Sequence, residues 1–115
     1  MSIRKRSDRE YSAHLQGTLD LLILRTLEAG PLHGYAIGQQ INQTSRALLR
    51  VPQGSLYPAL HRLEKKGLLA AEWIDTDGGR RAKVYRLTRR GYQQLAREIA
   101  DWQRLSKAIG WILQT

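Results

Sequence analysis

The chain has 115 residues, a net charge of +9 and no cysteine. Its length suits one domain with a small core, and without cysteine it has no disulfide, thiolate zinc site or cysteine nucleophile. No apolar run reaches the roughly 18 residues that a membrane span needs, and the N-terminus lacks the apolar centre of a signal peptide, so we expect a cytoplasmic protein.

The positive charge is concentrated in two segments. Residues 46–66 contain five basic residues and one acidic residue, and residues 75–90 contain six basic and two acidic residues, so each segment has a net charge of +4. Together they carry eight of the nine net charges. Charge that served only solubility would be spread over the chain, whereas clustered charge is typical of phosphate binding.

The N-terminal third predicts an arm and two helices. Residues 1–17 are basic without apolar periodicity and predict a mobile arm, which either touches a DNA backbone or is a free terminus. Apolar residues at helical spacing over residues 18–29 predict a core-facing helix that Gly30 and Pro31 end. A second helix is expected over residues 34–43. Tyr35, near its start, is either a phosphate contact or a partly buried core tyrosine.

A basic amphipathic helix follows. Leu56, Leu60 and Leu63 recur at spacings of four and three and predict a buried stripe. Ser55 is expected to cap the helix, which places Pro58 in the first turn, and Gly67 is expected to end it. The outward face would meet a DNA major groove. We include two residues at its start among the candidate DNA contacts, which are Gln53, Ser55, Tyr57, His61, Arg62, Lys65 and Lys66.

A solvated surface helix is the alternative for this segment alone, but the residues after it favour DNA binding. Alternating residues over 69–75 and 82–87 predict an antiparallel hairpin with its tip at residues 76–81. Arg80, Arg81 and Lys83 make this hairpin basic. A basic helix followed by a basic hairpin indicates a winged helix-turn-helix.

The last segment predicts a long helix that Thr88 caps. Its apolar positions recur at spacings of three and four, which indicates a heptad-like seam, and a helix of about 25 residues would be roughly 37 Å long. Packing on the first helix can account for the N-terminal half of the seam, but the far end needs a second subunit. The expected dimer interface comprises Leu95, Ile99, Trp102, Ile109 and Leu113.

The sequence resembles the PadR family of transcriptional regulators over about residues 15–113. The resemblance rests on residues 17–24 (GTLDLLIL), 30–37 (GPLHGYAI), 53–68 (QGSLYPALHRLEKKGL), 80–88 (RRAKVYRLT) and 102–105 (WQRL). It implies a winged-helix DNA-binding domain, a homodimer formed through the C-terminal helix, and usually a repressor that a small molecule releases. It further resembles the branch with a single short C-terminal helix, in which a transporter or detoxification gene is a common target.

The resemblance also implies a role for Trp102. Multidrug-responsive members of the family have a tryptophan at the matching position, where aromatic ligands stack between subunits. Trp102 is therefore a candidate effector contact, and a residue that only seals the dimer interface is the alternative.

We therefore expect a mainly α fold with a small β-hairpin, a winged helix-turn-helix with a long C-terminal dimerisation helix. The expected units are the arm (1–17), the DNA-binding domain (18–88) and the dimerisation helix (89–115). The expected partners are a palindrome-like operator in double-stranded DNA, a second copy and a small aromatic effector. We expect no enzyme, cofactor or metal, because nucleophile and phosphate-loop motifs are missing and the three histidines lack ligand spacing. A winged-helix adaptor that binds proteins is the competing function.

Overall fold

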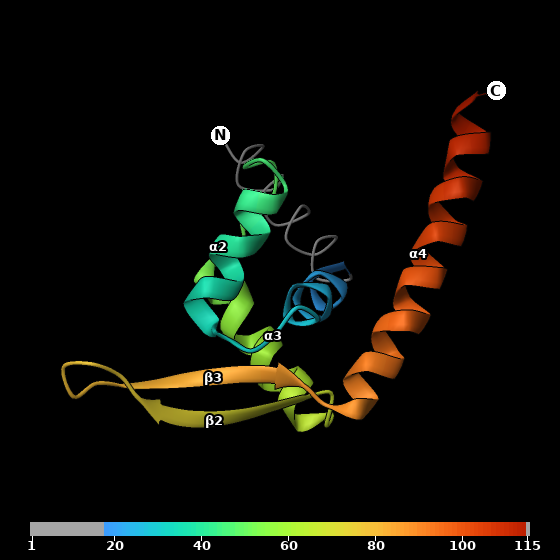
Figure 1. Ribbon diagram of the computed structural model, residues 1–115. Helices are drawn as coiled ribbons and strands as arrows, with labels where there is room; N and C mark the ends of the chain where they lie inside the picture. Colours follow the sequence, from blue (N-terminus) through green and yellow to red (C-terminus); the bar gives the residue numbers. More distant parts are fainter. Residues whose placement is uncertain (1–17, 115) are drawn as a thin grey trace.

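The computed structural model describes residues 18–114, so the arm predicted over residues 1–17 lies outside the described residues. A first helix spans residues 18–27. The elements that follow are β1 (Leu32–His33), α2 (Gly34–Thr44), α3 (Gln53–Lys65), β2 (Leu69–Asp75), β3 (Arg81–Leu87) and α4 (Arg89–Gln114). Figure 1 shows the first three helices gathered above the sheet, with the β2–β3 hairpin projecting to one side and α4 to the other.

The core lies between the first three helices and one face of the sheet. The predicted stripe of Leu56, Leu60 and Leu63 is buried. The first helix and α2 add Ile23, Leu24 and Ile37, which have no exposed surface. Burying each such side chain contributes about 1.5 to 3 kcal/mol. The core therefore fixes the direction of α3, because Leu56, Leu60 and Leu63 must all face inward.

The sheet has three antiparallel strands in the order β1-β3-β2. The hairpin of β2 and β3 confirms the prediction, with Leu69 opposite Leu87 and Trp73 opposite Lys83. At its tip, the Thr76 backbone N–H and hydroxyl both donate to the Arg80 carbonyl at 2.7 Å. Strand β1 was not predicted, because two residues are too short to show an alternating pattern.

The predicted cap of α3 is wrong. The helix begins at Gln53 after Pro52, whose backbone is extended, so Ser55 lies inside the first turn. Pro58 is consequently inside the helix and removes the hydrogen bond that the Gly54 carbonyl would otherwise accept. The predicted end is confirmed, because Gly67 adopts a φ of 77° and the Leu68 N–H donates to the Leu63 carbonyl at 3.0 Å.

Helix α4 begins where the sequence indicated. The Thr88 hydroxyl accepts a hydrogen bond from the Gly91 N–H at 3.1 Å and donates to the Gly67 carbonyl at 2.7 Å. A Cβ on Gly91 would lie 2.2 Å from the Leu68 carbonyl oxygen, so only glycine allows this approach. These contacts hold the start of α4 against the end of α3.

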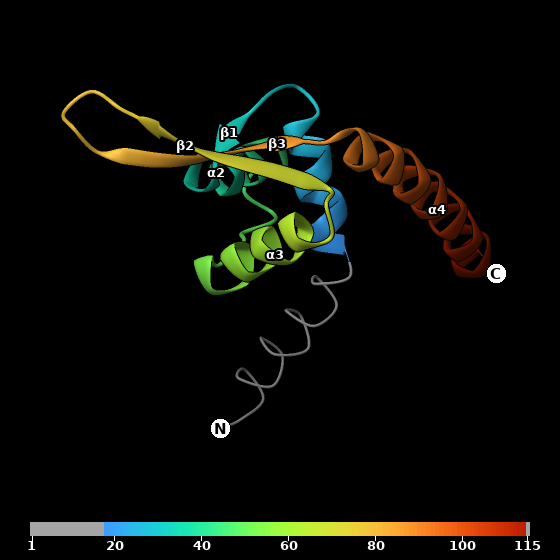
Figure 2. The ribbon, with the colours of Figure 1, turned by 90° about the horizontal axis from the view of Figure 1, so that it is seen from below.

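The far half of α4 leaves the body of the molecule. Its 26 residues give a length of about 39 Å. Figure 2 shows α4 and the hairpin at opposite ends of the molecule. Within residues 18–114, no helix combines the length and the apolar character needed to cross a bilayer.

Candidate nucleic-acid interface

The outward face of α3 carries Tyr57, His61 and Lys65, which follow one another at intervals of four residues and are all exposed. They lie opposite the buried leucines because the helical period places them there. The face therefore combines a phenol, an imidazole and an ammonium group, which can hydrogen-bond with base edges.

Tyr57 also packs against α2. A Cβ on Gly34 would lie 2.8 Å from Cε1 of the Tyr57 ring, so the ring occupies the space that a side chain at residue 34 would need. Tyr57 nevertheless keeps 42% of its surface exposed. The contact orients the ring at the junction of α2 and α3.

A polar cleft of about 310 Å³ separates α2 from the start of α3. Tyr35, Gln39, Gln43, Arg50 and Gln53 line it. Amide, phenol and guanidinium donors converge there, an arrangement that suits a phosphate. Tyr35 is 55% exposed, so the alternative of a core tyrosine is wrong.

Sequence reasoning assigned no role to Arg50, Gln39 or Gln43. Arg50 could have been identified as a candidate DNA contact from the sequence, because it belongs to the first of the two segments with a net charge of +4. The two glutamines are on α2, and only the packing of α2 against α3 brings them beside Gln53.

Arg62 does not lie on the outward face, which corrects the prediction. Its Nη2 atom is 2.6 Å from Oδ1 of Asp20 on the first helix, and the two side chains are 33% and 21% exposed. This ion pair ties α3 to the first helix. Ser55 is half-buried in the first turn, and Lys66 is exposed just beyond the last helical residue.

The three basic residues predicted in the wing, the β2–β3 hairpin, differ in their surroundings. Arg80 is exposed in the tip of the hairpin. The Nε atom of Arg81 lies 3.9 Å from the Asp75 carboxylate, and both side chains are largely exposed. Nζ of Lys83 donates to Oε1 of Glu64 on α3 at 3.2 Å, and this hydrogen bond raises the pKa of Lys83. Lys83 therefore links the wing to α3.

A second cleft, of about 220 Å³, lies between the first helix and α4. Trp102, which is 48% exposed, lines it with Leu21, Glu98 and Asp101. Burial, and then the nearby Asp20 carboxylate, raise the pKa of Glu98. The surroundings of Trp102 are therefore apolar and acidic.

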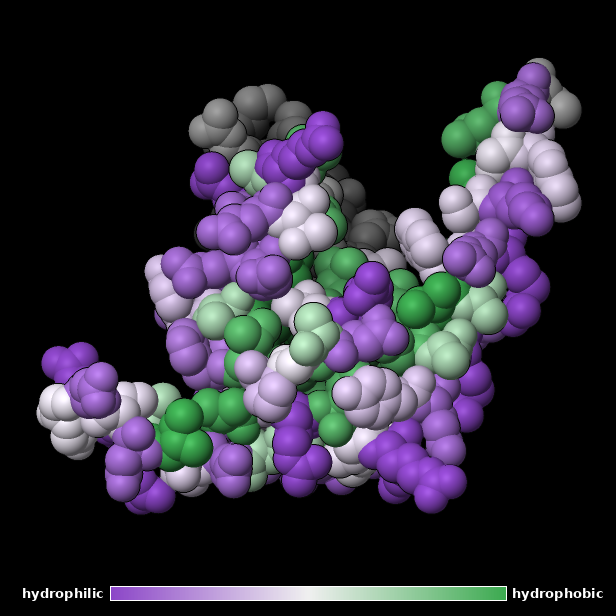
Figure 3. All heavy atoms as spheres, in the orientation of Figure 1, coloured by the Kyte–Doolittle hydropathy of each residue, from purple (hydrophilic) through white to green (hydrophobic). Residues whose placement is uncertain are grey.

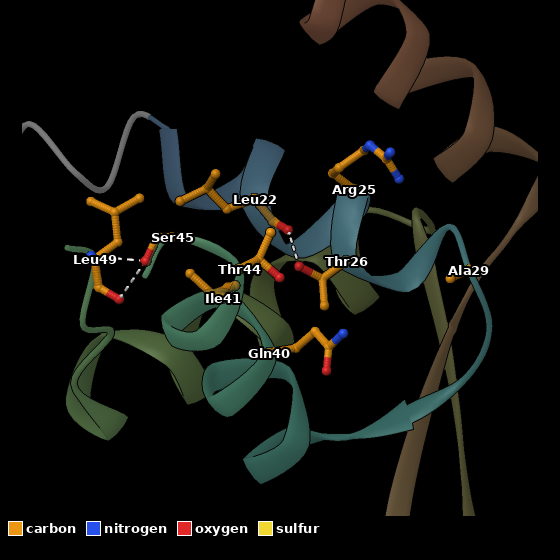
Figure 4. A pocket seen from close by; sticks show the side chains of 9 residues that line it. All are labelled: Leu22, Arg25, Thr26, Ala29, Gln40, Ile41, Thr44, Ser45 and Leu49. Atoms are coloured by element: carbon orange, nitrogen blue, oxygen red, sulfur yellow. Dashed lines mark hydrogen bonds between the residues drawn. The ribbon is translucent and has the colours of Figure 1, made fainter. Parts of the chain in front are cut away.

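The cleft in Figure 4 has a different character. It measures about 330 Å³ and lies between the first helix, α2 and the loop after α2. Leu22, Ile41 and Leu49 make it mainly apolar, and the guanidinium of Arg25 is paired with Glu28 at 2.8 Å. It is similar in volume to the polar cleft between α2 and α3 but differs from it in chemistry.

Leu95 corrects the predicted dimer interface. It is 2% exposed and belongs to the core of its own chain, while Ile99 packs half-buried against that core. Trp102, Ile109 and Leu113 are 48%, 44% and 79% exposed. Figure 3 shows hydrophobic side chains near the C-terminal end of α4 on the side toward the body, with hydrophilic ones on the outer side.

Three helices, a three-stranded sheet and a basic hairpin beside an exposed helix face define a winged helix-turn-helix. Residues 23–97 match the model of the transcriptional regulator PadR-like family. The chain therefore belongs to this family of transcriptional regulators. Its members regulate transcription and are not enzymes, as the sequence led us to expect.

Several relatives resemble the chain over most of its length. A transcriptional regulator of Mycobacterium tuberculosis is 40% identical over 93 residues, which are 72% of this chain and 83% of the relative. A PadR family regulator from Eggerthella lenta superposes with a TM-score of 0.79 at 30% identity, covering 100% of this chain and 99% of that one. Bacillus subtilis PadR, solved in complex with operator DNA, superposes with a TM-score of 0.66 at 26% identity over 71% of this chain and 46% of its own.

Proposed function

We propose that this regulator is a sequence-specific DNA-binding repressor that acts as a homodimer, with α3 in the major groove and the wing beside it. The observation that carries this proposal is the exposed face of α3, Tyr57, His61 and Lys65, flanked by exposed cations at Arg50 and Arg80. The operator complex of Bacillus subtilis PadR supports the same use of the fold.

We assign the side chains to base contacts, phosphate contacts and structural contacts according to where they lie. His61 and Lys65 are assigned to base edges, since they stand on the outermost line of α3. Tyr35, Arg50 and Gln53 are assigned to a phosphate at the polar cleft, and Arg80 and Arg81 to the backbone beside the wing. Arg62 and Lys83 are assigned structural roles. Arg62 joins α3 to the first helix through Asp20, and Lys83 joins the wing to α3 through Glu64.

The exposed stripe on α4 supports the homodimer. Trp102, Leu105, Ile109 and Leu113 follow one another at spacings of three or four, so they share one side of the helix. Pairing two such stripes would remove them from water, and a two-fold axis would present two copies of α3 to a palindrome-like operator. The half-sites would then lie about one helical turn apart.

The cleft at Trp102 supports a small aromatic effector that releases the repressor from a transporter or detoxification gene. An aromatic molecule would stack on the exposed indole and bury its apolar surface against Leu21 and Leu105. Such a ligand regulates only if it binds the DNA-free arrangement more tightly than the DNA-bound one, and the change in operator affinity equals that difference.

Selection of bound duplexes from a random pool tests DNA binding and returns the operator. We expect affinity to fall steeply and linearly with the logarithm of salt concentration. Lys65→Ala should weaken the preference for one base at one operator position by about 1 to 3 kcal/mol. Lys107→Ala removes the same charge from the exposed surface of α4 and should leave this preference intact. A chain with no affinity for any duplex would instead support the protein-binding adaptor.

A further inference from the structure

Trp73 is an exposed tryptophan that the proposed DNA contacts do not use. It lies on β2 directly opposite Lys83 on β3, and it is 56% exposed. Residues paired across antiparallel strands project from the same face of a sheet. Leu69 and Tyr85 on this face are buried in the core, and Lys83 reaches Glu64 of α3. Trp73 therefore lies on the α3 side of the wing.

Two cations lie over the indole. The guanidinium carbon of Arg81 is 5.6 Å from the ring centroid, and Nζ of Lys83 is 6.0 Å from it. Both distances are within the range in which the negative face of an aromatic ring attracts a cation. Nζ of Lys83 also lies 5.3 Å from the ring centroid of Tyr85. Trp73 is thus the outer of the two rings in a row of rings and cations along this face, and Arg81 lies beyond it toward the tip.

The indole restricts the side chain of Arg81 more than that of Lys83. An exposed arginine loses much side-chain freedom when it must meet a phosphate in one geometry. Its exposed contact with Asp75, at 3.9 Å, restrains it little. The indole offers a flat, rigid surface that limits the guanidinium to one side of the hairpin. Lys83 is already held by Glu64 at 3.2 Å.

We propose that Trp73 is a positioning residue of the wing, which holds the Arg81 guanidinium on the α3 side, where the DNA backbone would lie. This inference rests on the proposed DNA binding. Without the indole ring, Arg81 would keep its charge. Its side chain would then have to be ordered when DNA binds, and this loss of conformational entropy would lower the affinity. Direct stacking of the indole on a base is the competing role, and it would require an unstacked base in the duplex.

The test compares Trp73→Leu, Trp73→Tyr and Arg81→Gln with the wild-type chain, together with the double variant Trp73→Leu/Arg81→Gln. Affinity for the selected operator is measured at several salt concentrations. We expect Trp73→Leu to weaken binding about two- to fivefold, the range that an exposed cation–ring contact supports. Trp73→Tyr keeps an aromatic face and should recover most of the affinity. In the Arg81→Gln background, Trp73→Leu should have little further effect.

Ile74→Ala is the matched control, because Ile74 is the next residue on β2, is 41% exposed and projects from the opposite face. It should bind as the wild type does. Unchanged binding by Trp73→Leu, or losses that simply add in the double variant, would overturn the positioning role. Additive losses without recovery by tyrosine would assign the indole a direct DNA contact instead. If the wild type binds no duplex, DNA binding itself fails and this inference falls with it.

Discussion

At the scale of single residues, basic side chains of the same helix have different environments. Lys65 is exposed to solvent, whereas Arg62, three residues before it, is half-buried against Asp20. Removing one member of a half-buried ion pair leaves the other charge without its partner in a poorly solvated place. The two residues should therefore respond differently to the same substitution.

We expect Arg62→Ala to destabilise the fold by about 1 to 3 kcal/mol, since Asp20 would lose its charged hydrogen-bond partner. Thermal unfolding measures this loss directly. Lys65→Ala serves as the control. Its free energy of unfolding should differ from that of the wild type by no more than about 0.5 kcal/mol, as is usual for substitutions at exposed sites. Equal melting of Arg62→Ala and the wild type would show that the pair contributes nothing.

Glu98 makes stability depend on pH. Burial and the Asp20 and Asp101 carboxylates raise its pKa, while a hydrogen bond with Gln94 and the charge of Lys66 act in the opposite direction. A raised folded-state pKa means that folding favours the protonated carboxyl group. Its contribution to stability is complete below the ordinary pKa of glutamate and is lost as pH rises through the folded value.

Glu98→Gln should consequently be more stable than the wild type at pH 7, with a smaller difference at pH 4. Thermal unfolding at both pH values measures the effect, and Glu72→Gln on the exposed surface of β2 is the control. A variant that is less stable than the wild type at pH 7 would contradict the assigned effect of burial.

At the scale of elements, the joint between α3 and α4 depends on one glycine. Gly91 is buried at the start of α4, where a Cβ would lie 2.2 Å from a backbone oxygen of Leu68. Helix propensity alone would favour alanine there by about 1 kcal/mol. The backbone contact opposes this preference, since neither α4 nor the end of α3 can move without disturbing Thr88.

We expect Gly91→Ala to destabilise the protein by about 1 to 3 kcal/mol or more, which chemical denaturation measures. Gly110, on the same helix, has nothing within 4 Å of its added Cβ. Gly110→Ala is therefore the matched control and should raise stability by up to about 1 kcal/mol. Equal changes in the free energy of unfolding for the two variants would show that the backbone at Leu68 moves to accept the added Cβ at little cost.

At the scale of the whole molecule, the exposed apolar stripe of α4 predicts assembly. The side chains of Ile109 and Leu113 are 44% and 79% exposed, although the same helix side carries buried Leu95 nearer the body. A stripe that continues beyond its own core is typical of a helix that packs against another copy.

Ile109→Asp should shift the chain from dimer to monomer, because pairing the two stripes would bury an unpaired charge from each subunit. Sedimentation at micromolar concentration measures the change, and operator affinity should fall as the second half-site contact is lost. Gln103→Asp introduces the same charge at an exposed position away from the stripe and should remain dimeric. A monomeric wild type at this concentration would refute the homodimer.

Much of the fold was predictable because its signals are local. The spacing of Leu56, Leu60 and Leu63 predicted the buried side of α3, and the glycines at its end and in the hairpin marked the turns. The same spacing placed Tyr57, His61 and Lys65 outward. The start of α3 was misplaced because the extended backbone of Pro52, rather than the hydroxyl of Ser55, begins the helix.

The remaining decisions belong to the tertiary structure, because they depend on partners distant in the chain. Asp20 is 42 residues from Arg62, and Glu64 is 19 from Lys83, so no local pattern could show that these two cations are engaged within the protein. The seam on α4 was visible in the sequence. Packing within the chain was expected for the N-terminal half of the seam, but only the tertiary structure showed that Leu95 belongs to the core of its own chain and not to the dimer interface, because burial depends on which surfaces meet.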